Sequence, residues 1–341
     1  MRRFFSSILL PYLFLVTTIS SVTFTAQAEQ ASEIAPLASK SLLLDITLVD
    51  SSKLVAVGQH GHILLSHDAI NWQQADVPIQ STLTGVFFIN AMKGWAVGHD
   101  NSILHTRDGG QTWQIQQYMP EKEKPLLDIV FKNEMEGIAV GAYGLFYRTT
   151  DGGNTWQSEF HQEFLNPDDA EYLAELKAED EEAYLDETSS ILPHFNRIIQ
   201  DGRTLYLVGE IGLIAKSNDF GQHWQMFDEI YHGSFFDIAR TYDGNLLVVG
   251  LRGHIFRSLK NGRPWQQVNS GTTALLNSIV LTDDNRIIVL GNNGVILVSN
   301  DDGQSYKLQT QSDGKALIAG AWFNGQLIAV SDVGIKIIKV K

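Results

Sequence analysis

The sequence has no cysteine among its 341 residues, and this absence removes whole classes of protein. Disulfide scaffolds, thiolate zinc sites, iron–sulfur clusters and cysteine nucleophiles are all excluded. A surplus of basic residues is missing too. The formal net charge is −14, which argues against a general nucleic-acid binder, because such a protein needs a basic face. Charged residues make up only 19 % and apolar residues 44 %, so the composition predicts a folded chain rather than a disordered one.

Long apolar runs are missing beyond residue 28, where no stretch reaches the roughly 20 apolar residues of a membrane span. Before that point, Arg2 and Arg3 precede an uncharged, largely apolar stretch that closes on Ala26-Gln27-Ala28. A basic start, an apolar middle and small residues two apart predict a signal peptide over 1–28, cleaved near Ala28. An uncleaved membrane anchor is the alternative. The expected location is the bacterial periplasm, or the medium outside the cell.

A unit of about 40 residues repeats along the rest of the chain. Its marker is a glycine after an apolar residue, with a second glycine three positions later. Successive markers are 40–43 residues apart, except for one spacing of 68. In the second unit Asn101 replaces the second glycine, which indicates a position with positive φ, because asparagine tolerates that conformation best after glycine. The seven markers begin at Gly58, Gly98, Gly141, Gly209, Gly250, Gly291 and Ser331.

Each unit predicts short strands. Apolar runs such as 43–46, 54–57 and 63–65 are separated by turn residues, a pattern of strands rather than helices. Four strands in about 40 residues is the size of a propeller blade. We therefore expect an all-β, seven-bladed β-propeller over residues 29–341; the alternatives are an open solenoid or two sandwiches. The last unit has only three strands, and residues 34–40 could supply the fourth and close the ring.

A second motif, Ser/Thr-x-Asp-x-Gly-x-x-Trp, follows the glycine marker, as in the segment from Thr106 to Trp113. A short aspartate side chain can accept hydrogen bonds from its own turn, and a tryptophan can fill the space between blades. A residue set repeated in every blade is structural by default, because one catalytic centre does not need six copies. The residues given this structural role are Asp68, Asp108, Asp151, Asp219, Asp301, Trp72, Trp113, Trp156, Trp224 and Trp265.

The two residues between the paired glycines vary from unit to unit. In a propeller these turns share one face with the blade-to-blade loops, and the aspartate turns lie on the opposite face. Variation at these turns suits a binding rim, and tolerant surface turns are the alternative. The candidate rim residues are His60, His99, Asp100, Tyr143, Glu210, Arg252, Asn292 and Asn293.

The long spacing places an insertion between the third and fourth blades, at about residues 158–190. It contains twelve Asp or Glu residues and one lysine, and therefore most of the net charge. Asn166, Pro167 and Asp168 are typical of a helix start, and apolar residues from Tyr172 to Tyr184 could form one stripe along a single helix to about residue 187. Such an insertion suits a docking element, and a solvated acidic appendage is the alternative.

No spacing marks a catalytic set, so the sequence predicts no catalytic residues, no cofactor and no metal site. Groups that a sialidase would use occur only singly, Arg197 among them. No glycine loop leads from a strand into a helix as in nucleotide-binding proteins. Two well-placed carboxylates would suffice for an ordinary glycosidase, and sequence alone leaves that reading open.

The combined unit is clearest from Val97 to Trp113 and from Val140 to Trp156, and it resembles the photosystem II stability and assembly factor family, which has non-photosynthetic bacterial relatives. Its second motif is similar to the Asp box, or BNR repeat, of sialidases. The resemblance covers residues from about 40 to 341. It implies a non-catalytic propeller that helps assemble a membrane-protein complex of the cell envelope, such as an exporter of the resistance–nodulation–division type. We also expect a monomer, and the acidic composition predicts no nucleic-acid partner. A glycan-binding or sialidase-like propeller is the alternative.

Overall fold

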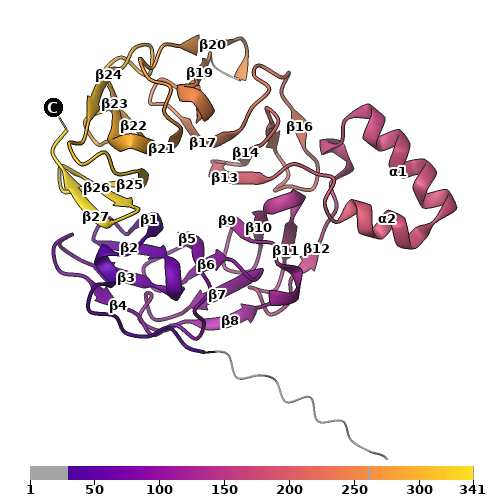
Figure 1. The fold of residues 1–341 in the computed structure, drawn as a ribbon, viewed down its shortest axis with the longest axis horizontal. Coiled ribbons are helices and arrows are strands. Elements are labelled where there is room, and N and C mark those ends of the chain that lie inside the picture. Colours follow the sequence, from indigo (N-terminus) through magenta and orange to yellow (C-terminus); the bar gives the residue numbers. More distant parts are fainter. Residues whose placement is uncertain (1–29, 260–261, 341) are drawn as a thin grey trace, which may run out of the picture.

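The computed structural model describes residues 30–259 and 262–340, so the predicted signal peptide lies outside the described residues. Seven antiparallel sheets stand around a central axis (Figure 1). Each sheet follows chain order from an inner strand at the axis to an outer strand at the edge. The inner strand of every sheet contacts that of the next, and the last contacts the first, so the ring is closed. The prediction of a seven-bladed propeller is confirmed.

The strands of the first four blades are β1(Leu43–Val49), β2(Lys53–Gly58), β3(Ile63–Ser66) and β4(Gln73–Gln74); β5(Leu83–Phe88), β6(Gly94–Gly98), β7(Ser102–Thr106) and β8(Gln114–Gln117); β9(Leu126–Phe131), β10(Gly137–Gly141), β11(Phe146–Thr149) and β12(Gln157–Ser158); and β13(Phe195–Asp201), β14(Thr204–Gly209), β15(Ile214–Ser217) and β16(Gln225–Met226). Blades 5 to 7 contain β17(Phe235–Arg240), β18(Leu246–Gly250), β19(Ile255–Ser258) and β20(Trp265–Val268); β21(Leu276–Leu281), β22(Ile287–Gly291), β23(Val295–Ser299) and β24(Lys307–Thr310); and β25(Leu317–Phe323), β26(Gln326–Ser331) and β27(Gly334–Ile338).

The hydrophobic core is divided among the seams between blades. Each pair of neighbouring blades shares one apolar cluster, including the pair formed by blades 7 and 1. The second strand of each blade is almost fully buried, because it lies inside its own sheet and between two neighbouring sheets. Its sequence is therefore a continuous apolar run rather than an alternating one.

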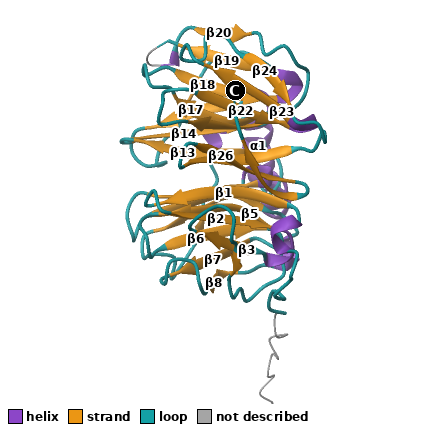
Figure 2. Cartoon of the chain, turned by 90° about the vertical axis from the view of Figure 1, so that its left-hand side faces the viewer, coloured by secondary structure: helices purple, strands orange, loops and turns teal. Residues whose placement is uncertain are grey.

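The strands run across the thickness of the ring, so that the turns gather on its two faces (Figure 2). Leu43 at the start of β1 pairs with Gly58 at the end of β2, and the other blades repeat this register. The glycine-pair turns therefore lie on the same face as the start of each inner strand. We call this the glycine-turn face, and the opposite one the Asp-box face.

Every inner strand has a β-bulge at its second residue. The register shifts between Leu43 and Asp45 in blade 1, between Phe195 and Arg197 in blade 4, and at the equivalent place in the other five. A bulge re-aims side chains and ends regular pairing. The second residue of every inner strand lines the central channel, and so does the third residue in every blade except blade 2, where it is Gly85.

The expected closing strand at residues 34–40 is wrong. In the described residues blade 7 has three strands, and the segment ends in a short 3-10 helix, η1(Ala38–Lys40), which packs against β27. Pro36 has no N–H to donate to a neighbouring strand, so a strand through this position would be interrupted. The ring is instead closed by side chains: Ala38 and Ala35 pack in the cluster shared by blades 7 and 1.

The insertion between β12 and β13 projects outward from the ring (Figure 1). It forms two helices, α1(Pro167–Glu179) and α2(Glu181–Thr188), so the expectation of a single helix is wrong. The cause is Asp180, whose side chain accepts the N–H of Ala183 and so caps α2 where α1 ends. Asn166 caps α1 as expected, by accepting the N–H of Asp169. Neither helix has the length and apolar character to cross a membrane, and no other helix in the described part of the chain does.

Candidate functional site

The aspartates of the repeated motif are bound within their own turns. Asp151 accepts hydrogen bonds from the N–H of Thr155 (2.9 Å) and from the hydroxyl groups of Thr155 and Thr149. The Thr155 N–H contributes most to lowering the pKa of Asp151, and the two hydroxyl groups add to it. Such a carboxylate stays ionised and accepts local donors, which is what a structural role requires. The same arrangement recurs at Asp108, Asp219 and Asp301, and in a shorter turn at Asp68.

The tryptophans of this motif lie against aromatic residues of their own or the preceding blade. Trp113 meets Phe88 edge-on at 6.0 Å between ring centroids, and Trp156 meets Phe131 at 5.9 Å. Trp224 packs against Phe146, and Trp265 against Phe227. Trp72 lies at the seam of blades 7 and 1. The contacts of Trp224 and Trp265 join neighbouring sheets, and Trp113 and Trp156 also pack in the apolar clusters at the seams with the preceding blades. This packing leaves the indole rings little surface for a ligand.

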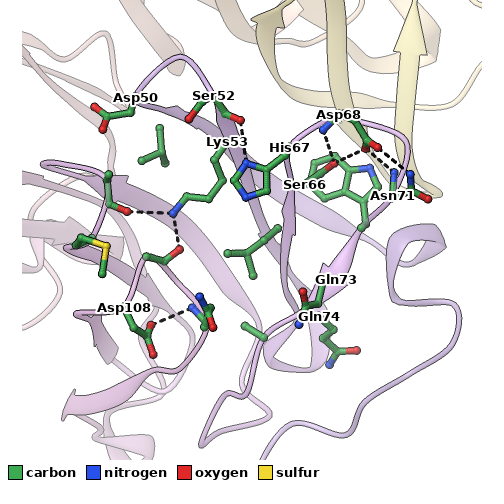
Figure 3. A pocket seen from close by; sticks show the side chains of 18 residues that line it. Asp50, Ser52, Lys53, Ser66, His67, Asp68, Asn71, Gln73, Gln74 and Asp108 are labelled. Atoms are coloured by element: carbon green, nitrogen blue, oxygen red, sulfur yellow. Dashed lines mark hydrogen bonds between the residues drawn. The ribbon is translucent and has the colours of Figure 1, made fainter.

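A cavity of about 660 Å³ opens on the Asp-box face between blades 1 and 2 (Figure 3). Buried Lys53 donates to the carbonyl oxygens of Ala91 (3.0 Å) and Gly109 (2.6 Å), and burial lowers its pKa. His67 contacts the carbonyl oxygen of Ser52. Lys53 therefore ties two blades together. Asp68 and Asp108 are also bound in their own turns. Lys53 and these two aspartates at the cavity therefore stabilise the fold.

Hydrogen bonds of alternating polarity link the inner strands around the channel. In blades 1, 3 and 5 an aspartate accepts a backbone N–H of the next blade; in blades 2, 4 and 6 a threonine or asparagine donates to a backbone carbonyl of the next blade. The acceptor pairs are Asp45 with Val86, Asp128 with Ile198 and Asp237 with Ile279; the donor pairs are Thr84 with Leu126, Asn196 with Phe235 and Asn277 with Leu317.

Arg197 lies among these three aspartates. Its Nη1 is 3.9 Å from Asp45, and its Nε is 3.5 Å from Asp128 and 3.7 Å from Asp237. Arg197 lines two cavities of the channel, one of about 340 Å³ at the glycine-turn face and one of about 190 Å³ farther along the inner strands. Burial raises the pKa of Asp128 to about 6 in spite of Arg197, and burial also raises the pKa of Asp237.

The channel carboxylates have the spacing of a glycosidase pair, but Arg197 contacts both of them. Asp128 and Asp237 both lie within 3.7 Å of the same Nε atom, so they are no farther apart than glycosidase carboxyl pairs, roughly 5–9.5 Å. The Arg197 guanidinium lies beside both carboxylates. Each carboxylate also accepts two backbone N–H groups, from Ile129 and Ile198 or from Ile238 and Ile279, and is almost fully buried. Both carboxylates are therefore bound to the backbone of the ring.

The eight candidate rim residues occupy equivalent turns on six different blades, and the structure does not gather them into one site. The second residue of the turn has a positive φ of 55–58° at His60, Asp100, Tyr143, Arg252 and Asn293. Asn101 has φ of 52°, as its replacement of glycine predicts. His99 precedes Asp100 in the turn, and its backbone N–H donates to the carbonyl oxygen of Thr82. Asn292 accepts a hydrogen bond from the side chain of Asn277.

Two of the rim residues converge next to the insertion. Tyr143 of blade 3 meets the ring of His194 edge-on at 4.6 Å. Glu210 of blade 4 accepts the backbone N–H of His194 (3.2 Å) and lies 3.5 Å from its ring nitrogen. Lys124 lies over Tyr143 and donates to the carbonyl oxygen of Ser189 at the end of α2. Sequence reasoning missed His194 and Lys124, because both lie outside the repeated turn.

The base of the insertion is fixed to the ring. Arg148 forms a two-pronged ion pair with Glu159 (2.6 and 2.9 Å) and donates to the carbonyl oxygens of Phe220 and Gly221 in blade 4. Phe164 is buried in the cluster that blades 3 and 4 share. The helices themselves contribute little to this cluster: between residues 167 and 188 only Leu173 is buried.

Two grooves of opposite charge flank this base. On the side of blade 3, a groove of about 490 Å³ is lined by Lys122, Lys124 and Tyr143, and by Glu159, which is paired with Arg148. On the side of blade 4, a groove of about 240 Å³ is lined by apolar side chains with Asp169, Glu210 and Glu229. This is the place on the glycine-turn face where rim residues, the insertion and preformed grooves meet, so we take it as the candidate partner-binding site.

Comparison with known proteins supports this architecture. The family model described as photosynthesis system II assembly factor YCF48 matches residues 66–158 and 193–311. The photosystem II assembly protein Ycf48 of Thermosynechococcus vestitus is 40 % identical over 43 residues, which are 13 % of this chain and 12 % of the relative.

Two solved structures share the fold. The structure described as YCF48 bound to D1 peptide has a TM-score of 0.67 at 19 % identity, covering 92 % of this chain and 99 % of that one. Virginiamycin B lyase from Staphylococcus aureus has a TM-score of 0.68 at 12 % identity, covering 91 % and 99 %. Because a lyase and an assembly factor share this fold, the fold alone does not decide between catalysis and binding.

Proposed function

The chain belongs to the photosynthesis system II assembly factor YCF48 family, and from this premise we propose that it is a non-catalytic factor that binds a membrane protein and assists its assembly. The solved relative bound to a D1 peptide supports a polypeptide ligand rather than a small molecule. The sequence match to the curated relatives spans only about an eighth of their length.

The observation that carries the proposal is the asymmetry of the glycine-turn face. Six blades present similar turns with dissimilar side chains, and at blades 3 and 4 these turns meet a projecting insertion and two grooves. A surface of this kind suits recognition of an irregular polypeptide surface, because repeat scaffolds place insertions on their binding face. The channel carboxylates and the Asp-box aspartates, by contrast, are bound by the ring itself.

We further propose that the protein acts on the outer side of a bacterial inner membrane. The support is the basic, apolar and small-residue pattern of residues 1–28. The partner class that fits this location and the family is an envelope membrane complex, such as an exporter of the resistance–nodulation–division type.

Cross-linked capture tests the proposal. A tagged full-length chain is cross-linked in cells, the envelope is solubilised, and captured proteins are identified by mass spectrometry. We expect one integral membrane protein to be enriched. The rim variant Tyr143→Ala should reduce its recovery, whereas Met92→Ala on the Asp-box face should not. Repeated recovery of no membrane protein would reject the proposal.

The alternative is a glycan-binding or glycoside-hydrolysing propeller. Its support is kinship of the Asp box with sialidases, but the channel carboxylates that could act as an acid and a base are separated by Arg197. Binding or turnover in a screen of sialosides and cell-wall glycans would favour this alternative over assembly.

A further inference from the structure

The groove between the insertion and blade 4, which we call the acidic groove, has an apolar floor that is already formed. Phe164 and Leu213 are buried in the core of blades 3 and 4, and Leu165 and Ile191 pack against the same cluster. Phe164 meets Phe195 edge-on at 5.0 Å between ring centroids. The floor therefore does not need to reorganise when something binds. At about 240 Å³ the groove is smaller than small-molecule pockets, roughly 300–1,000 Å³, and it suits one or two side chains of a polypeptide.

Large apolar side chains are exposed at its edge. Ile211 is 57 % exposed on the turn after β14, and Met226 is 43 % exposed on the outer strand β16. Single exposed apolar residues need no explanation, but two beside an apolar groove extend a continuous apolar surface.

Ile211 is also held in an unfavourable backbone conformation. Its φ is 54°, in the left-handed region that β-branched residues strongly avoid. The equivalent positions in blades 1, 3, 5 and 6 have histidine, tyrosine, arginine and asparagine. Blade 4 thus combines a strained turn with an exposed apolar side chain, and neither stabilises the fold. Strain of this kind is typical of ligand-binding positions.

The charges around the groove are all of one sign. Asp169, Glu210 and Glu229 line it, and no lysine or arginine is among its lining residues. Helices α1 and α2, which continue from its edge, are rich in Asp and Glu. The groove on the other side of the insertion has Lys122 and Lys124, and its one carboxylate, Glu159, is paired with Arg148, so the two flanks would select oppositely charged segments.

We propose that the acidic groove binds an extended segment of the partner polypeptide in which one or two large apolar side chains are flanked by lysine or arginine. The apolar side chains enter the groove beside Ile211 and Met226, and the cations face Asp169 and Glu229. Basic side chains suit this position in a second way, because their apolar stems can cover the exposed edge while their charged ends stay in water. The inference rests on the proposed function, since it names the chemistry of the partner.

A selection with a random dodecapeptide library displayed on phage tests the chemistry directly. The bait is the full-length protein, and the variant Ile211→Asn serves for counter-selection. Asparagine tolerates positive φ, so this variant should fold with a Tm equal to or above that of the natural protein. We expect the enriched peptides to combine large apolar residues with lysine or arginine. Enrichment of acidic or small polar sequences, or equal enrichment on the variant, would overturn the inference.

Affinities of the selected peptide then locate the site. In fluorescence polarisation, Ile211→Asn should weaken binding at least tenfold, and Asp169→Asn combined with Glu229→Gln about threefold to tenfold. The control Ile70→Asn, at an exposed isoleucine of the Asp-box face, should change binding less than twofold. Changes below twofold in both groove variants would place the peptide elsewhere and reject the inference.

Capture from cells separates this inference from the proposed function. If the natural protein captures a membrane protein and Ile211→Asn captures it equally well, the proposed function stands and the acidic groove is not the docking site. If the natural protein captures none, the proposed function fails first. Loss of capture in Ile211→Asn with its Tm retained supports both.

Discussion

Individual side chains at the third position of the inner strands decide how the ring is held at its centre. Asp45, Asp128 and Asp237 each bind the backbone of the next blade, and all three share Arg197 as their cation. Three buried carboxylates and one guanidinium leave an excess of negative charge in a region of low polarity. The site is therefore stable only because backbone N–H groups and Arg197 act on the same carboxylates.

Replacing Arg197 by methionine should strongly destabilise the protein. The variant leaves three buried carboxylates without their cation. Because the Arg197 side chain is itself 35 % exposed, the cost should be about 2–3 kcal/mol, below the value of a fully buried pair. Urea unfolding at pH 7.5 measures the loss. Arg203→Met, at an exposed position near the end of the same strand, should cost less than about 1 kcal/mol. Equal effects of the two substitutions would show that the channel cation is dispensable.

The carboxyl group of Asp128 should make stability depend on pH in an unusual direction. Burial raises its pKa to about 6, so the folded state binds this proton more tightly than the unfolded chain does. Its contribution to stability is present in full below about pH 4 and is lost as the pH rises through 6. Between pH 7 and pH 4 the natural protein should therefore gain up to roughly 3 kcal/mol relative to Asp128→Asn. Unfolding free energies of both proteins across this range test it, and a difference that does not change with pH would contradict it.

Among the elements, the repeated ones follow from the sequence and the irregular ones do not. The strands and their order were predictable because apolar runs and glycine markers recur in every unit, and Asn101 even indicated a positive φ. The split between α1 and α2 was missed because one capping aspartate in an acidic stretch gives no distinct signal. The closing strand was wrongly predicted because Pro36 has no N–H to donate to a neighbouring strand, and this was not taken into account.

The candidate site shows the same division. The sequence singled out Tyr143 and Glu210, since both lie in the repeated turn, but it gave no reason to join them. Their link is His194, which precedes β13 and belongs to no repeat. Arg197 was noticed only as an isolated arginine. Aligning the third residue of every inner strand would have shown it in a position that is aspartate in three other blades.

The insertion consists of a structural base and an appended helical pair, and the two parts should respond differently to mutation. Replacing residues 168–187 by a short Gly-Ser linker removes one buried side chain, Leu173, and should change Tm by less than about 3 °C. Phe164→Ala removes a core aromatic and should cost about 3–5 kcal/mol. Thermal unfolding followed by circular dichroism compares them. A cooperative loss of the propeller in the helix deletion would show that the helices are part of the fold.

At the scale of the whole molecule, the ring closes between blades 7 and 1 without a shared sheet. The N-terminal segment reaches this seam by contacts with blade 1: Ser32 donates its N–H to Val77, and Ala35 to the side chain of Gln74. Gly334 at the start of β27 approaches the same segment from blade 7. Closure at this seam therefore depends on the packing of side chains from blade 7, blade 1 and the N-terminal segment, and this seam is where we expect the ring to open first.

A pair of glycine substitutions in blade 7 tests the seam. A Cβ atom at Gly334 would lie 2.1 Å from the carbonyl oxygen of Ser39, and φ there is 95°. Gly325 has a similar positive φ of 74° but nothing within 4 Å, so it isolates the backbone effect. Gly325→Ala should cost about 1 kcal/mol from backbone strain alone, and Gly334→Ala about 3 kcal/mol because the two segments must also separate. Hydrogen exchange should then accelerate in β27 and η1 of Gly334→Ala, while blades 3 to 5 stay protected. If both variants lose the same stability and exchange alike, closure does not depend on this contact, and the seven blades hold the ring by their lateral packing alone.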